Sequence, residues 1–136
     1  MSVLRCFTVV VLSTTFVFAV QAADPGKDKS ADACDDPMLG TAGRSECYDG
    51  QYKKEDAELN LVYRQVMSHL DSKSQRDALK TAQRAWISYR DKECAFDAAR
   101  YEGGTEMNVV LPACLYRETG LRTDALRDYL KMLGDG

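Results

Sequence analysis

Apolar side chains recur at three- and four-residue steps through residues 48–70, with charged side chains between them. This spacing is typical of an amphipathic helix that buries one face. The repeating positions are Tyr52, Leu59, Val62, Tyr63, Val66, Met67 and Leu70. The pattern predicts a helix over residues 48–70, preceded over residues 34–46 by a loop that is rich in Pro and Gly.

A second helix is predicted after a polar break at residues 71–74, where Ser72 or Ser74 can cap its first turn. It ends at about Arg100, because the pair Gly103-Gly104 stops helices efficiently. Its apolar positions are Leu79, Ala82, Trp86, Ile87 and Tyr89.

A third helix is predicted over about residues 111–133, with Pro112 in its first turn and Gly120 as a weak point inside it. Its apolar positions are Leu111, Leu115, Leu121, Leu126, Tyr129, Leu130 and Leu133. No stretch alternates with the two-residue period of a strand. The sequence therefore predicts an all-α fold, in which a small antiparallel helical hairpin is closed by a third helix.

The short break between the first two helices makes them antiparallel neighbours. Residues at the same level then have positions that sum to about 145. The facing pairs are Val66–Leu79, Tyr63–Ala82, Asn60–Trp86 and Asp56–Arg90. Because a buried charge must be paired, we expect an ion pair between Asp56 and Arg90, with Asn60 hydrogen-bonded across the same layer. We interpret these polar residues as structural and as fixing the hairpin register; a functional site is the alternative.

Residues 1–22 have the features of a secretory signal peptide, with Arg5 before an apolar run and a cleavage point after Ala22. An uncleaved anchor is the alternative, although the run is short for a membrane span. We expect a flexible segment over residues 23–33 and one domain over residues 34–136. Cleavage leaves 17 basic and 21 acidic residues, a net charge of −4. The predicted location is periplasmic or secreted, without a stable membrane anchor.

Four cysteines remain after cleavage, and small exported domains commonly join such cysteines in disulfides. They are Cys34, Cys47, Cys94 and Cys114, separated by 13, 47 and 20 residues. These separations do not match C-x-x-C spacing, which disfavours a zinc or redox site. Of the three possible connectivities we prefer the two local pairs, Cys34–Cys47 and Cys94–Cys114. Free buried thiols are the alternative.

The sequence shows no residue set that indicates catalysis, a cofactor or a metal site. His69 is the single histidine, and no cysteine, histidine or glutamate lies near it at metal-ligand spacing. The pairs Asp35-Asp36 and Glu55-Asp56 are sequence neighbours, so neither pair by itself spans a cleft as glycosidase chemistry requires. Basic residues do not outnumber acidic ones, which argues against a nucleic-acid partner. We therefore expect a non-enzymatic protein with a protein partner.

Two strings of residues carry a resemblance to a known family: D-A-E-L-N-L-V-Y at 56–63 and Q-R-A-W-I-S-Y-R-D-K-E-C at 83–94. With the flanking cysteines and Gly103-Gly104, they resemble the LprI-type lysozyme-inhibitor family, whose pattern is D-x-x-L-N-x-x-Y and then Q-x-x-W-x-x-Y-R-D-x-x-C. The matching residues are Asp56, Leu59, Asn60, Tyr63, Gln83, Trp86, Tyr89 and Arg90. The resemblance implies a small helical protein of the cell envelope and suggests lysozyme as its partner.

An inhibitor of this kind would bind lysozyme or a related peptidoglycan hydrolase and block its cleft. An acidic chain is attracted over long range to basic lysozymes, which supports this hypothesis. The segments that can protrude into a cleft are residues 35–46, 71–74 and 102–110, and the sequence does not choose among them. The alternative is a non-catalytic periplasmic interaction or stress-response module with another protein partner.

Overall fold

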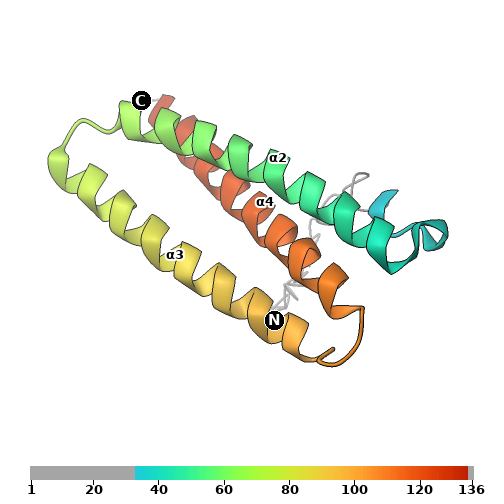
Figure 1. Ribbon diagram of the computed structural model, residues 1–136. Helices are drawn as coiled ribbons and strands as arrows, with labels where there is room; N and C mark the ends of the chain where they lie inside the picture. The colour runs from blue at the N-terminus through green and yellow to red at the C-terminus, as the bar shows by residue number, and fades with distance from the viewer. Residues whose placement is uncertain (1–32, 135–136) are drawn as a thin grey trace, which may run out of the picture.

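The structure, a computed structural model, describes residues 33–134 of the chain. A short 3-10 turn, η1 (Pro37–Leu39), precedes three long helices, which are α2 (Gly40–His69), α3 (Lys73–Ala99) and α4 (Met107–Gly134). Figure 1 shows that α2 and α4 run side by side in the same direction, while α3 returns in the opposite direction. The all-α prediction is confirmed. The predicted signal peptide lies outside the described residues.

The start of α3 agrees closely with the prediction, and Ser72 is the capping residue. Its hydroxyl accepts a hydrogen bond from the Gln75 N–H at 3.1 Å, and Gln75 Oε1 accepts one from the Ser72 N–H, also at 3.1 Å. This reciprocal pair satisfies two donors that a helix otherwise leaves free at its N-terminus.

The loop predicted over residues 34–46 is wrong beyond Leu39, because α2 already begins at Gly40. Glycines disfavour a helix here by about 1 kcal/mol each, which is why the local sequence suggests a loop. Tertiary contacts override this preference. The Cys34–Cys47 disulfide and an ion pair between Arg44 and Glu106 at 3.0 Å hold the extra helical turns in place.

The third helix also begins earlier than predicted, at Met107, so that Pro112 is its sixth residue and does not lie in its first turn. Proline has no N–H, and the carbonyl of Asn108 therefore lacks its normal partner within the helix. The hydroxyl of Ser45 on α2 donates to that carbonyl at 2.8 Å. The helix continues through Gly120 without a break.

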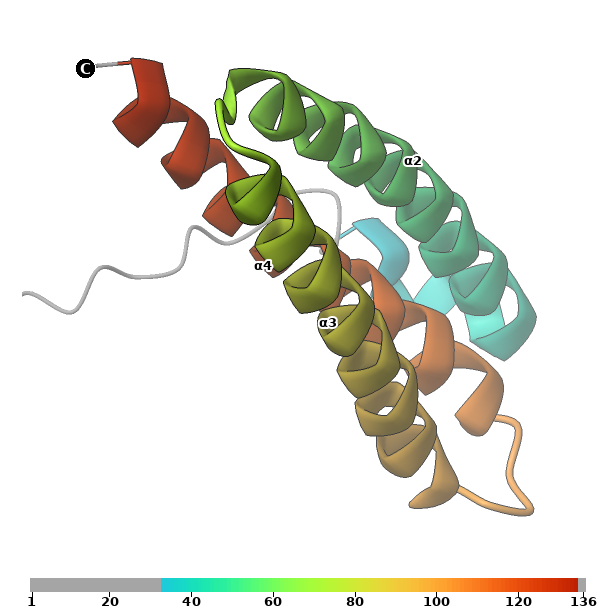
Figure 2. The same cartoon turned by 90° about the vertical axis from the view of Figure 1, so that its left-hand side faces the viewer.

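The main packing partner of α2 is α4, and α3 packs against α4 on another side. Figures 1 and 2 show α3 standing away from α2 over much of its length. The predicted core pair Tyr63–Ala82 is wrong, because Ala82 is exposed. The buried face of α3 consists of Gln83, Arg90, Cys94 and Ala98.

The core contains two apolar clusters with a polar layer between them. One cluster joins Cys34, Tyr48, Val109 and Tyr116, and the other joins Leu59, Val62, Val66 and Leu126. Between them lie the fully buried Thr119 and Thr123, of which Thr123 donates to the Thr119 carbonyl at 2.9 Å. Four apolar positions expected to line α4 are instead exposed: Leu111, Leu121, Tyr129 and Leu133.

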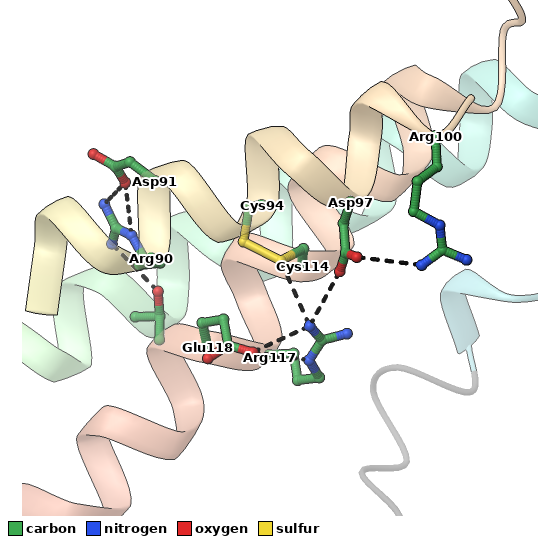
Figure 3. The surroundings of a disulfide bond; sticks show 9 residues. Arg90, Asp91, Cys94, Asp97, Arg100, Cys114, Arg117 and Glu118 are labelled. Carbon is green, nitrogen blue, oxygen red and sulfur yellow. Dashed lines mark hydrogen bonds and ion pairs between the residues drawn. A yellow bond between two sulfur atoms is a disulfide. The ribbon is translucent and has the colours of Figure 1, made fainter. Parts of the chain in front are cut away.

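Both disulfides follow the preferred local pairing, Cys34–Cys47 and Cys94–Cys114. The second one fastens α3 to α4, and Figure 3 shows Arg117 beside it. The guanidinium of Arg117 lies 3.6 Å from the carboxylate of Asp97 across the helix pair. Each loop closure contributes about 3 kcal/mol by restricting the unfolded chain. Among residues 33–134, no helix is both long enough and apolar enough to cross a membrane.

Candidate functional site

The parallel arrangement of α2 and α4 brings two of the three candidate segments, residues 35–46 and 102–110, to one end of the molecule (Figure 1). Arg44 joins them through its ion pair with Glu106 at 3.0 Å, and Ser45 joins them through the Asn108 carbonyl. The third segment, residues 71–74, lies at the opposite end. We call the surface formed by residues 35–49 and 101–112 the acidic end.

The acidic end carries more negative charge than residues 23–136 as a whole. Its carboxylates are Asp35, Asp36, Glu46, Asp49, Glu102 and Glu106, and Arg44 is its single basic residue. Six negative charges and one positive charge give −5, whereas residues 23–136 together carry −4. The rest of residues 23–136 is therefore close to neutral, and negative charge is concentrated at this end.

An open groove of about 890 Å³ runs along the acidic end between α2 and α4. Glu46 and Asp49 line its α2 side, while Leu111, Pro112 and Leu115 line its α4 side. Asp49 accepts a hydrogen bond from Lys53, and this bond raises the pKa of the Lys53 ammonium group. The groove thus offers carboxylates beside apolar carbon, a combination that suits contact with a basic protein surface.

A rigid turn projects from this end and presents an apolar tip. Met38 is 90% exposed and Leu39 is 42% exposed, both on η1. Asp36 caps the turn by accepting a hydrogen bond from the Met38 N–H at 2.9 Å, and Arg44 lies 3.5 Å from the Asp35 carboxylate. Because the Cys34–Cys47 disulfide also anchors the turn, its shape is fixed before any partner binds.

The motif residues lie elsewhere, around a groove of about 380 Å³ between α2 and α3. Seven of the eight line it: Asp56, Leu59, Asn60, Tyr63, Gln83, Trp86 and Arg90. The eighth, Tyr89, is 54% exposed and does not line the groove. The structural role assigned to these residues remains a prediction.

The expected ion pair is present, with Arg90 Nη1 3.8 Å from the Asp56 carboxylate. Asp91, the next residue along α3, is a closer partner at 2.8 Å. The guanidinium also stacks on Trp86, 5.1 Å from the ring centre. The expected hydrogen bond from Asn60 to the facing helix is wrong. Asn60 Nδ2 donates instead to the carbonyl of Asp56 on its own helix, at 2.7 Å.

Met38, Arg44 and Ser45 lie in the candidate segment 35–46, but no pattern distinguished them from its other residues, because none of them belongs to the motif. A proline inside a helix was the one available signal, since Pro112 frees a carbonyl that another residue must satisfy. In the part of the chain that the structure describes, no group of three or more His, Cys, Asp or Glu side chains is placed to hold a metal ion.

Comparison with known proteins agrees with the motif. The family model described as "Lysozyme inhibitor LprI" matches residues 34–126. A curated relative, "Uncharacterized protein R02472" of Rhizobium meliloti (strain 1021), is 33% identical over 97 residues, which cover 62% of this chain and 70% of the relative. No solved structure gives a significant match. Since the family model spans more than half of the chain, from the first disulfide to the buried Leu126, this protein belongs to the LprI family of lysozyme inhibitors.

Proposed function

We propose that this protein binds lysozyme or a related peptidoglycan hydrolase with its acidic end and blocks the cleft of that enzyme. The observation that carries the proposal is the concentration of six carboxylates around a rigid turn with an exposed apolar tip. The family relationship supports inhibition as the activity, and the two disulfides fit a protein that acts in the periplasm or outside the cell.

Two physical effects act together at this end. The negative field attracts a basic enzyme and speeds association, an effect that salt screens over about 10 Å at 0.1 M ionic strength. After the encounter, Met38 and Leu39 bury apolar surface against the enzyme. Because the turn is already held by the disulfide and the Asp36 cap, little conformational entropy is lost on binding.

The direct test is lysozyme turnover on cell walls with increasing amounts of the purified mature protein, over a salt series. We expect stoichiometric inhibition that weakens as salt is added. Asp35→Asn/Asp36→Asn should reduce the association rate, while Asn at position 36 keeps the cap. The matched control is Asp71→Asn/Asp77→Asn, the same charge change at the opposite end, which should inhibit like the wild type.

Met38→Ala tests the apolar tip separately. The side chain is 90% exposed, so its removal should leave the melting temperature unchanged and should speed dissociation from the enzyme. Absence of inhibition at low salt, against several lysozyme types, would contradict the proposal. That outcome would favour the alternative, a non-catalytic interaction or stress-response module that binds another protein.

A further inference from the structure

The groove between α2 and α3 is unused by the proposed inhibition, which takes place at the acidic end. Its volume of about 380 Å³ falls within the range of small-molecule sites. The groove lies between α2 and α3, which both pack on α4 and have few contacts with each other. Side chains of α2 form one wall of the groove, and side chains of α3 form the other.

The charge of this groove is opposite to that of the acidic end. Lys80, Arg84 and Arg90 line it together with a single carboxylate, Asp56, which gives a net charge of +2. Arg84 is exposed, and within residues 33–134 it forms no ion pair. Lys80 reaches its neighbour Asp77 only at 3.8 Å. Arg90 is paired with Asp56 and Asp91, so Arg84 is the cation of this groove that is left for a ligand. An exposed, unpaired guanidinium in a groove of net positive charge favours an anionic ligand there.

The remaining lining indicates the class of anion. The walls are α-helices, whose backbone groups are already hydrogen-bonded, so an extended peptide would find no backbone partners. The groove is lined by the side-chain amides of Asn60 and Gln83 beside aromatic carbon from Tyr63 and Trp86. Asn60 Nδ2 is bonded to Asp56 and Gln83 Oε1 to Arg122, so Asn60 Oδ1 and Gln83 Nε2 are the amide atoms left for a ligand. Sugar hydroxyls pair with such amides, and the apolar faces of sugar rings pack on aromatic rings.

We propose that this groove binds an acidic glycan, with the sugar rings between Asn60, Tyr63 and Trp86 and a carboxylate at Arg84. Buried Arg90 supports the floor from below, since it stacks on Trp86 and its Nη1 lies 3.4 Å from the Thr119 hydroxyl. The motif residues would then both fix the packing of α3 on α4 and shape a ligand site.

Trp86 is the only tryptophan of the chain, so its fluorescence reports directly on the groove. The mature protein is titrated with N-acetylglucosaminyl-N-acetylmuramic acid, a disaccharide that carries one free carboxylate. The comparison ligands are neutral N,N′-diacetylchitobiose and a tetraglutamate peptide. We expect a saturable change of the Trp86 fluorescence with the acidic disaccharide. The neutral disaccharide should bind at least about fivefold more weakly, because it lacks the carboxylate and so loses one half-exposed ion pair.

Arg84→Gln should raise the dissociation constant of the acidic disaccharide by about fivefold, because one ion pair is lost. Arg64→Gln is the matched control, since Arg64 is exposed on α2 and does not line the groove. Its dissociation constant should stay within about twofold of the wild type. Equal effects of the two variants, equal binding of the neutral disaccharide, tighter binding of the peptide, or no saturable change would each overturn the proposal. Lysozyme inhibition is measured independently, so failure here leaves the proposed function intact.

Discussion

Loss of the Cys94–Cys114 disulfide should selectively loosen α3. The fully buried apolar residues of this helix are Cys94 and Ala98 alone, so its apolar attachment is smaller than that between α2 and α4. Its other links include the partly buried Leu79 and Trp86, which pack against the cluster around Leu126, and the bond from Arg122 to Gln83 at 2.9 Å. The disulfide closes a separation of 20 residues, and such a closure contributes about 3 kcal/mol.

This free energy converts into a large change of melting temperature. The described domain spans residues 33–134, and an unfolding entropy of about 2.1 cal/mol/K per residue gives about 0.2 kcal/mol/K for a domain of this size. A loss of 3 kcal/mol therefore lowers the melting temperature by about 15 °C. The variant Cys94→Ala/Cys114→Ala is compared with the wild type by calorimetry at neutral pH.

Hydrogen exchange then locates the effect. Amides of α3 should lose protection in the Cys94→Ala/Cys114→Ala variant before those of α2 and α4 do. The matched variant Cys34→Ala/Cys47→Ala removes a closure of 13 residues and should loosen the η1 turn while α3 stays protected. A fall of less than about 5 °C, with α3 as protected as in the wild type, would refute the reasoning that the disulfide is the principal attachment of this helix.

Three further predictions concern single features. Arg90→Ala should lower the free energy of unfolding in urea by about 1–3 kcal/mol, less than when a buried charge loses its partner. Both carboxylate partners of Arg90 are more than 40% exposed and stay hydrated. A loss above about 5 kcal/mol would contradict this prediction. Ser45→Ala should destabilise by about 1 kcal/mol, since the Asn108 carbonyl loses its donor, and an unchanged urea midpoint would show that water replaces the hydroxyl. The exported protein should begin at Ala23 and contain no free thiol, which intact mass and thiol titration check directly.

The boundaries of α3 and the disulfides could be predicted because their signals are local. Ser72 and Gln75 form a capping box within four residues, and the cysteine pairs close short loops. The start of α2 could not be predicted in this way, because the helix there depends on partners such as Glu106 that lie far along the chain. The local preference of the glycines for a turn was therefore the wrong guide.

The packing arrangement was the harder problem, since the central layer of the core is polar. Thr119 and Thr123 are fully buried, yet a search for apolar periodicity passes over them and selects exposed leucines such as Leu121. The short turn correctly predicted that α2 and α3 are antiparallel, but these two helices have few direct contacts with each other. It could not show that both helices bury their main faces on α4. The motif in the sequence indicated the residues of the groove between α2 and α3. The concentration of charge at the acidic end could not be predicted, because it depends on the fold bringing two distant segments together.

The parallel pairing of α2 with α4 also sets the order in which the chain can fold. Contacts across this pair join residues far apart in sequence, as in the bond from Arg127 to Glu58, which are 69 residues apart. Such a core has a high contact order for a helical protein, and it cannot form until the last helix is present. The Cys34–Cys47 disulfide, by contrast, closes a short loop at the start of the described domain, whereas Cys114 of the second disulfide belongs to α4 itself. We therefore expect the Cys34–Cys47 disulfide to form before the core does, so that the enzymes catalysing its formation act on a largely unfolded substrate.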